Sequence, residues 1–334
     1  MQTCIGFDIG RSSVKIVAAW ADQRAEVLYP SSVVPAFKIT DDREAERVQA
    51  ETVLVNGREF FFGETAMLQG QDDLAGGMRD DWVYTEQHAA LFLGGLKKLK
   101  AANVPNVDTA LIIMGLPAAL FASQKSGLSQ ELVKLAPRAE LRVMPQSLGP
   151  YHQMMFTKDG QESAEVRSDD DSWAVIEVGQ YTTDYALLLQ GHTIENAFGS
   201  CDGMRIAAEH LQRGLRKRDF SVSLVEATDL LRTKTLRNFG ERIDVSEEVA
   251  LAVEPLAATI IDKANQLIGR SARSLDGILV AGGGAPLVLP ALRKTWPHAK
   301  LTDNSRFSVS EGFCRYALAF NNYRRSQGKT GTEG

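Results

Sequence analysis

The chain has 334 residues, enough for about two domains, because a single domain usually spans roughly 100 to 200 residues. Its 44% hydrophobic and 24% charged residues are ordinary for globular proteins and exclude a disordered chain or a fibre. A formal net charge of -5 argues against broad nucleic-acid binding, and no apolar run approaches the roughly 18 residues of a membrane span. We therefore expect a two-domain soluble protein that binds neither DNA nor a membrane directly.

The cysteines and the first residues indicate the compartment. Cys4, Cys201 and Cys314 are isolated and odd in number, which is typical of reduced thiols, and no CxxC pair is present. The start of the chain lacks the basic segment and the small-residue cleavage site of a secretory leader. The sequence therefore predicts a cytoplasmic protein without a cysteine-bound metal.

The first half of the chain predicts short strands joined by turns, with one clear helix. The expected strands are apolar runs bounded by glycine or proline, at 4–9, 14–20, 26–34 (interrupted by Pro30) and 110–114. A polar stretch at 40–51 favours a loop or an exposed helix, and residues 53–63 predict a hairpin with an Asn-Gly turn. Apolar residues at helical spacing predict a helix at 86–102.

The second half repeats the alternation of strands and helices. A polar stretch at 157–172 favours a surface loop and a domain boundary, and strands resume at Trp173. The later elements are long helical patterns and one strand that meets three glycines, at 203–218, 246–271, 278–280 and 310–323, before a polar tail at 327–334 that we expect to fray. This alternation predicts an α/β protein.

An internal repeat is the most informative feature of the sequence. Residues 5–19 align without gaps on residues 174–188, at an offset of 169. Asp8 falls on Glu177 and Gly10 on Gly179, and both copies read as a strand, a polar turn with glycine, and a second strand. Two such hairpins, one near the start of each half, predict two similar domains that face each other across a cleft.

The residue types in these turns suit a phosphate group. Glycine lets the backbone approach a ligand closely, while backbone N–H groups and hydroxyls donate hydrogen bonds and a lysine adds positive charge. The residues that supply these features are Gly10, Ser12, Ser13, Lys15, Gly179, Thr182 and Thr183. Asp8 and Asp184 are suited to a Mg²⁺ ion that keeps most of its water ligands.

Two other nucleotide motifs are incomplete. Gly282, Gly283 and Gly284 follow a strand, but Leu287 stands where the dinucleotide fingerprint needs glycine or alanine. Residues 328–330 resemble the end of a P-loop, yet Tyr323 occupies the position of its first glycine. The three glycines instead favour a close backbone approach to adenine or ribose, or a simple strand-to-helix turn.

These residues resemble the actin, sugar-kinase and heat-shock chaperone superfamily of ATPases, whose two phosphate turns look like 8–15 and 177–184. Within it, the chain most resembles the ParM/StbA plasmid-segregation actins. The segments that carry this resemblance span about residues 1–320 and have family-level spacing: Pro30-Ser31 through Pro35, the hairpin 55–63 followed by Glu64-Thr65-Ala66, Gly115-Leu116-Pro117, and Met144-Pro145-Gln146-Ser147.

The resemblance implies a two-lobed, actin-like fold of two ribonuclease H-like halves, with ATP, or also GTP, and Mg²⁺ in the cleft. One lobe would comprise 1–155 and 306–330, and the other 156–305. The implied function is head-to-tail polymerisation into dynamic filaments that hydrolyse nucleotide. These filaments would segregate plasmid DNA through a DNA-binding adaptor at a centromere-like site.

The resemblance also assigns roles to single residues. It implies that Gln146 and Glu177 act in catalysis, and that Tyr181, Gly203 and Lys217 join the turn residues and the three glycines in holding the nucleotide. Two positions depart from the family pattern: Gln146 stands where these proteins often have glutamate, and Glu177 where they usually have aspartate. An amide orients water but is a poor general base, so we expect slow hydrolysis governed by positioning.

Two other functions remain as alternatives. A small-molecule kinase of the sugar-kinase type would share the fold, although no substrate-binding signature is evident. A membrane-associated assembly scaffold is less favoured, because the segment 324–334 lacks the apolar face of an anchoring helix.

Overall fold

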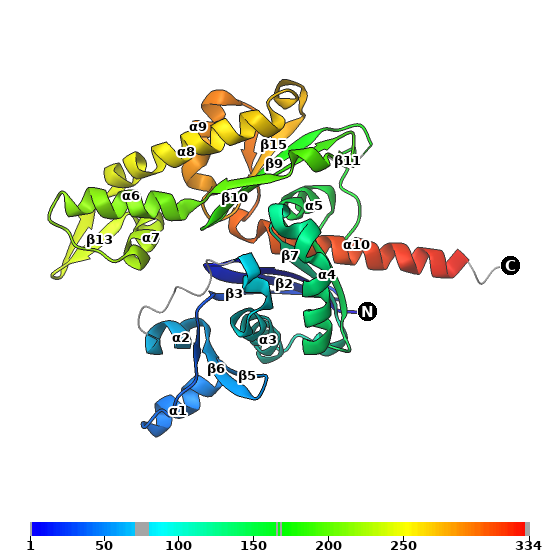
Figure 1. Cartoon of the computed structure of the whole chain (residues 1–334). Coiled ribbons are helices and arrows are strands. Elements are labelled where there is room, and N and C mark those ends of the chain that lie inside the picture. The colour runs from blue at the N-terminus through cyan, green and yellow to red at the C-terminus, as the bar shows by residue number, and fades with distance from the viewer. Residues whose placement is uncertain (1, 71–79, 165, 168, 331–334) are drawn as a thin grey trace. The chain divides into compact units, whose positions relative to one another are not determined.

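The computed structural model describes residues 2–70, 80–164, 166–167 and 169–330. The chain forms two compact units, which we call unit 1 (Met1–Val166 with Val309–Gly334) and unit 2 (Arg167–Ser308) (Figure 1). The sequence placed the division at 155/156 and 305/306, whereas these units divide at 166/167 and 308/309.

The segment that follows residue 155 is bound to unit 1, which explains the later division. Arg315 Nη1 donates to the carbonyl of Phe156 at 2.8 Å, and Asn322 Nδ2 donates to that of Asp159 at 3.0 Å. Gly160 has a φ of +74°, and a Cβ there would lie 2.5 Å from the amide nitrogen of Ala319. The first residues of the stretch expected to form a surface loop therefore form a turn held on the C-terminal helix.

The main sheet of unit 1 has the order β3-β2-β1-β7-β8, in which β1, β2 and β3 are antiparallel neighbours and β7 and β8 run parallel to β1. Its strands are β1 (Cys4–Ile9), β2 (Ser13–Trp20), β3 (Gln23–Pro30), β7 (Leu111–Leu116) and β8 (Glu140–Pro145). The helices of this unit's larger part are α3 (Glu86–Ala101), α4 (Ala118–Leu135), α5 (Gly149–Met155) and α10 (Ser308–Thr330).

Side chains on β1 alternate between two helical layers. Phe7 packs at 5.2 Å, ring to ring, against Phe92 of α3 and belongs to the same core cluster as Leu132 of α4. A Cβ on the opposite face, at Gly6, would lie 1.9 Å from the carbonyl oxygen of Ser310 in α10. Alternation along a strand thus places helices on both faces of the sheet.

A small sheet of order β4-β6-β5 completes unit 1. It contains β4 (Val33–Pro35), β5 (Thr52–Val55) and β6 (Arg58–Phe62), accompanied by the helices α1 (Asp42–Gln49) and α2 (Gly63–Gln69). The predicted Asn-Gly turn is confirmed, because Asn56 and Gly57 have φ values of 48° and 79°, as a type I′ hairpin turn requires. The predicted third strand is divided into β3 and β4 at Pro30.

Unit 2 contains a sheet of order β11-β10-β9-β15-β16, with β12 also paired to β10. Its strands are β9 (Trp173–Val178), β10 (Thr182–Leu189), β11 (His192–Thr193), β12 (Gly199–Asp202), β15 (Gly277–Ala281) and β16 (Ala299–Leu301). The other elements are α6 (Met204–Arg216), α7 (Leu224–Thr233), α8 (Ser246–Ile268), α9 (Ala285–Thr295), and a separate hairpin of β13 (Thr235–Asn238) and β14 (Glu241–Asp244).

The repeat found in the sequence is a repeat of structure. β9 and β10 begin and end 169 residues after β1 and β2. Asp8 faces Lys15 across β1 and β2, and Glu177 faces Asp184 across β9 and β10, so the strand register is also the same. In each unit the first strand is then joined on its other side by a parallel strand, β7 or β15. The duplicated α/β architecture expected from the sequence is therefore confirmed.

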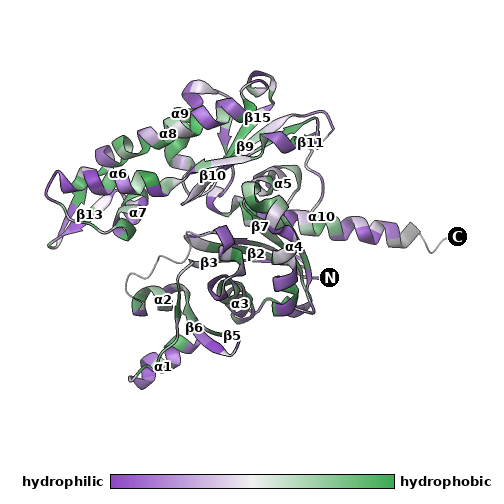
Figure 2. Cartoon of the chain, viewed as in Figure 1, coloured by the Kyte–Doolittle hydropathy of each residue, from purple (hydrophilic) through white to green (hydrophobic). Residues whose placement is uncertain are grey.

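The C-terminal helix extends beyond its predicted end at residue 323. α10 continues to Thr330, and residues 323–327 are exposed and polar (Figure 2). Apolar periodicity stops where the helix no longer packs, so the pattern ended earlier than the helix. Of the tail expected to fray, 331–334 lie outside the described residues. No helix in the described part of the chain is long and apolar enough to cross a membrane.

Candidate functional site

The first predicted phosphate turn joins β1 to β2. Lys15 Nζ lies 3.0 Å from Asp8 Oδ2, and Asp8 is buried. A Cβ at Gly10 would lie 2.9 Å from Lys15 Nζ, so the missing side chain is what lets the lysine pass over the turn. Asp8, Gly10 and Lys15 are thus brought together as predicted from their spacing.

Ser31 supports this turn from the next strand connection. Its amide donates to the carbonyl of Ser12 at 3.0 Å, and its hydroxyl donates to the carbonyl of Gly10. Two carbonyls of the turn are therefore bound on the side of β3. This contact gives a physical reason for the Pro30-Ser31 motif, which the sequence showed only as part of a resemblance.

Gln146 contacts Asp8 directly, although 138 residues separate them. Gln146 begins a 3-10 helix (Gln146–Leu148) after β8, and its Nε2 donates to Asp8 Oδ1 at 2.9 Å with both side chains buried. An ionised carboxylate only accepts hydrogen bonds, so the amide must present its NH₂ to Asp8. Its Oε1 then remains an acceptor for another group, such as a water.

Gly115 makes room for this glutamine. A Cβ at Gly115, on β7, would lie 2.5 Å from Gln146 Cγ and 3.0 Å from Phe313 Cε2. Neither distance is tolerated by carbon atoms in contact. The Gly-Leu-Pro motif thus has a role beside the site that the sequence did not reveal.

The second turn lies against the N-terminus of α6. The carbonyls of Gly179, Gln180 and Tyr181 accept hydrogen bonds from the amides of Met204, Arg205 and Gly203, at 3.0, 2.7 and 3.0 Å. Among the described residues, the amides of Gln180 and Tyr181 donate to no backbone carbonyl. Because these three carbonyls are bound to the start of α6, the turn can offer the amides of Gln180 and Tyr181 to an anion, as a backbone nest does.

Gly203 is required by this docking. A Cβ there would lie 2.7 Å from both the carbonyl oxygen of Gly179 and the amide nitrogen of Thr182. The first amides of α6 are occupied by the turn, so the turn and not the helix end is the candidate anion site. Gly203 therefore supports the turn rather than offering its own amide to a ligand.

The three glycines pack onto the end of β9. Gly282 has a φ of +89°, and a Cβ there would lie 2.3 Å from the carbonyl oxygen of Val178 and 2.9 Å from Glu177 Oε1. The amide of Gly284 donates to the carbonyl of Val178 at 3.0 Å. A Cβ at Gly283, in contrast, would meet nothing within 4 Å. The glycines thus bring Glu177, the second turn and an open backbone surface together in unit 2.

Comparison with known proteins agrees with this geometry. The family described as actin like proteins, N terminal domain, matches residues 6–149, and the C-terminal domain of the archaeal actin homologue MreB-like family matches residues 175–294. A non-polymerisable quadruple mutant of pCBH ParM is 23% identical, with a TM-score of 0.74 over 97% of this chain and 100% of that one. The chain has an actin-like fold.

Two further solved structures are similar to this actin-like chain. A 15-stranded ParM filament from Clostridium botulinum is 20% identical, with a TM-score of 0.73 over 95% of this chain and 99% of that one. The archaeal actin homologue Ta0583, in complex with ADP, is 16% identical, with a TM-score of 0.68 over 96% and 99%. No curated protein sequence matches the chain. The ParM-type resemblance seen in the sequence is confirmed at the level of the fold.

Two of the predicted site residues lie apart from the others or face away. Lys217 is exposed at the C-terminal end of α6, about 20 Å along the helix from Gly203 at its start. Thr183 is fully buried, and its hydroxyl donates to the carbonyl of Asp202 at 2.9 Å. Its neighbours Thr182 and Asp184 share the opposite face of β10, where Thr182 Oγ1 donates to Asp184 Oδ2 at 2.8 Å.

Cations near the glycines were missed in the sequence. The amide of Gly282 donates to the carbonyl of Ser305 at 2.8 Å, which places the 3-10 turn Ser305–Phe307 beside the glycines. Partial burial lowers the pKa of Arg306 in this turn, and Arg232 of α7 lowers it further. Arg306 thus lies in a turn that is bonded to Gly282, which only the folding of unit 2 could show.

A magnesium ion would have to be held through water in the candidate site. No group of three or more His, Cys, Asp or Glu side chains that could ligate a metal occurs in the described residues. The two oxygens of Asp8 already accept from Lys15 and Gln146, which leaves this carboxylate suited to bonding a metal's water ligands. Mg²⁺ commonly keeps several waters, so the residues present fit such a site.

Proposed function

We propose that the protein binds and hydrolyses a nucleoside triphosphate, with both turns holding phosphates of one nucleotide and the three glycines next to its base or ribose. The observation that carries this proposal is the second turn, whose three carbonyls are bound to α6 while the amides of Gln180 and Tyr181 remain available. The first turn adds the ammonium group of Lys15. The ADP complex of Ta0583, a structure of the same fold, supports it.

Hydrolysis would depend on the position of one amide. Asp8 accepts from Gln146 Nε2 and thereby fixes which way the amide points, so Oε1 is free to accept from the attacking water. A glutamine has no useful basicity, and its contribution is orientation. A bound Mg²⁺ would neutralise charge on the phosphates, held through water by Asp8 and Asp184. We therefore propose slow hydrolysis of ATP, or also of GTP.

We further propose that the protein polymerises head to tail into dynamic filaments in the cytoplasm and moves plasmid DNA through a DNA-binding adaptor. The fold shared with a ParM filament supports polymerisation. Three free cysteines are consistent with a reducing compartment. The net charge of -5 supports an adaptor, because a protein that gripped DNA by itself would gain from a basic surface.

Light scattering and electron microscopy with nucleotide test this function. Purified protein with Mg-ATP or Mg-GTP should show a sharp rise in scattering above a critical concentration, with filaments in micrographs and slow phosphate release. A chain that stays monomeric at high concentration with every Mg-nucleotide would refute it. Nucleotide consumption that requires an added sugar would instead identify a small-molecule kinase.

A further inference from the structure

The first phosphate turn is held by a single residue. Ser31 donates its hydroxyl to the carbonyl of Gly10 and its amide, at 3.0 Å, to the carbonyl of Ser12. The second turn is held differently, because the three amides that bind its carbonyls all belong to the backbone at the start of α6. A substitution of one side chain can therefore release a carbonyl of the first turn, whereas those three bonds of the second turn contain no side-chain atom.

These two bonds orient peptide planes of the turn. A trans peptide is planar, so its carbonyl and its N–H point in opposite directions. The carbonyls of Gly10 and Ser12 point toward Ser31. The amides in the same two peptide planes, those of Arg11 and Ser13, therefore point to the opposite face of the turn. Ser31 thus decides which face of the turn presents donors and which presents carbonyls.

Ser31 is itself fixed on both sides along the chain. Pro30 pairs with Ser13 at the end of the β2–β3 ladder and, because proline has no N–H, it cannot donate a further ladder bond. The carbonyl of Ser32 accepts from the amide of Gly63 at 3.0 Å, and β4 then pairs with β6. The hydroxyl of Ser31 is therefore in place before any ligand binds, which keeps the entropic cost of its bond low.

The terminal phosphate of a nucleoside triphosphate belongs beside this turn. In the proposed function Gln146 accepts from the attacking water, and a water poised for attack lies about 3 to 3.5 Å from the phosphorus. Gln146 is bonded to Asp8, which lies near the end of β1, and β1 leads directly into the turn. A water held by Gln146 is therefore close to the first turn, and so is the phosphate that this water attacks.

We propose that Ser31 is a positioning residue that keeps the donors of the first turn directed at the terminal phosphate and so sets a preference for triphosphate over diphosphate. This inference rests on the proposed function and deepens it. Without the hydroxyl, the carbonyl of Gly10 loses its partner and can turn toward the phosphate, where oxygens that both carry negative charge repel each other. Loss of this one bond should weaken triphosphate binding about 3- to 10-fold and change diphosphate binding by less than about twofold.

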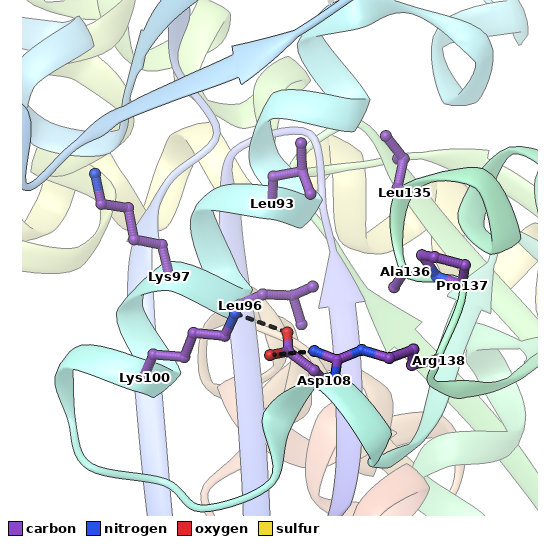
Figure 3. Close-up of a pocket in the computed structure, with 9 residues that line it drawn as sticks. All are labelled: Leu93, Leu96, Lys97, Lys100, Asp108, Leu135, Ala136, Pro137 and Arg138. Atoms are coloured by element: carbon purple, nitrogen blue, oxygen red, sulfur yellow. Dashed lines mark hydrogen bonds and ion pairs between the residues drawn. The ribbon is translucent and has the colours of Figure 1, made fainter.

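Unit 1 also carries cations at the edge of a pocket, but these are bonded differently. The pocket lies between α3 and the chain that follows α4, and has a volume of about 310 Å³ and an apolar floor (Figure 3). Asp108 accepts from Lys100 Nζ at 2.7 Å and from Arg138 Nη2 at 3.0 Å. Lys97 Nζ donates to the carbonyl of Thr52 at 2.9 Å. Because these cations are already bonded within unit 1, the pocket is less suited to a phosphate than the turn, and it supplies a control.

Nucleotide titrations test this role of Ser31. The parent, Ser31→Ala and Ser31→Thr proteins are titrated with Mg-AMPPNP and with Mg-ADP, or with the guanine counterparts if the parent prefers guanine, below the concentration at which scattering rises. Ser31→Ala should bind Mg-AMPPNP about 3- to 10-fold more weakly while its affinity for Mg-ADP stays close to that of the parent. Ser31→Thr keeps the hydroxyl and should bind both nucleotides as the parent does. The thermal midpoint of each variant shows that it is folded.

Two control variants accompany these titrations. Ser129→Ala is the matched control, because Ser129 is half-buried like Ser31 and its hydroxyl also donates to a carbonyl, that of Lys125 in α4, at 2.8 Å. It should bind both nucleotides as the parent does. Lys100→Gln removes a cation from the edge of the pocket and should also leave both affinities unchanged. A loss of Mg-AMPPNP affinity in Lys100→Gln, with Ser31→Ala unaffected, would place the terminal phosphate at the pocket and overturn the proposal.

The pair of nucleotides separates this role from a structural one and from the proposed function. Equal weakening of both nucleotides by Ser31→Ala would show that the hydroxyl only supports the fold, and no weakening would show that the turn does not depend on it. Either result overturns the proposal and leaves the proposed function in place. Binding by Ser31→Thr as weak as that by Ser31→Ala would assign the effect to packing and also overturn it. A parent chain that binds neither nucleotide would instead refute the proposed function, and this inference with it.

Discussion

Gly115→Ala should slow hydrolysis without touching the nucleotide. The new Cβ would lie 2.5 Å from Gln146 Cγ, whereas carbon atoms in contact rest about 3.5 to 4.0 Å apart. Phe313 stands 3.0 Å away on another side, so the alanine has no room to retreat in that direction. Gln146 must therefore move by about 1 Å, the difference between these distances.

A shift of this size breaks the contact that orients the amide. The bond between Gln146 Nε2 and Asp8 Oδ1 is 2.9 Å long, and lengthening it by about 1 Å takes it beyond hydrogen-bond range. A displacement of about 1 Å near a reacting group can lower a rate about 100-fold. Overpacking should also cost about 1 to 3 kcal/mol of stability. Nucleotide affinity should change little, because the turn residues are untouched.

The assay is phosphate release per polymerised subunit, measured beside nucleotide affinity and the thermal midpoint. Gly214→Ala is the matched control, because a Cβ there meets nothing within 4 Å and the residue lies inside α6. Alanine should stabilise that helix by about 0.5 to 1 kcal/mol and leave hydrolysis unchanged. Parental turnover in a folded Gly115→Ala protein would show that Gln146 does not position the water.

The remaining predictions concern the same pair and the buried histidines. Gln146→Ala should form filaments but release phosphate more slowly by about tenfold or more, and unchanged release would place the water elsewhere. Gln146→Glu replaces the donor to Asp8 by a second carboxylate, so it should break this contact and slow phosphate release, and parental release would show that the contact does not orient the water. Asp8→Ala removes the partner of both Lys15 and Gln146 and should weaken Mg-nucleotide binding about 10- to 100-fold by titration, while normal affinity would remove Asp8 from the site. Burial lowers the pKa of His88 and of His152 to about 4, so the unfolded chain binds more protons below pH 6.5. Stability should fall as the pH drops from about 6.5 to 4, by up to about 3 kcal/mol per histidine, and a flat urea midpoint over that range would contradict this.

The duplicated hairpins were predictable because their information is local. Apolar runs, a glycine and a few polar residues recur at an offset of 169, and strand pairing follows from that pattern. The Asn56-Gly57 turn is equally local, since only a few residues tolerate its backbone angles. The sequence therefore predicted both hairpins and the α/β class. The helix α4 (Ala118–Leu135) went unpredicted, because it buries only a few of its residues and its apolar stripe is weak.

Contacts between distant segments could not be read in this way. Asp8 contacts Gln146 although 138 residues separate them, and Ser31, which follows β3, bonds the first turn. The carbonyls of the second turn accept hydrogen bonds from the first amides of α6. Each depends on how strands and helices pack, which no local spacing encodes. The distance of Lys217 from the three glycines also depends on packing. Lys217 lies at the C-terminal end of α6, and a helix of 13 residues places its end about 20 Å from its start.

The sequence by itself determined that this protein has two related halves, each with a turn suited to phosphate. Tertiary structure alone decided which donors and acceptors of these turns remain for a ligand. Packing binds the carbonyls of the second turn to α6, commits the hydroxyl of Thr183 to the carbonyl of Asp202, and fixes the amide of Gln146 on Asp8. Hydrophobic periodicity specifies the elements, but the direction of a donor or acceptor depends on the partner that folding brings to it.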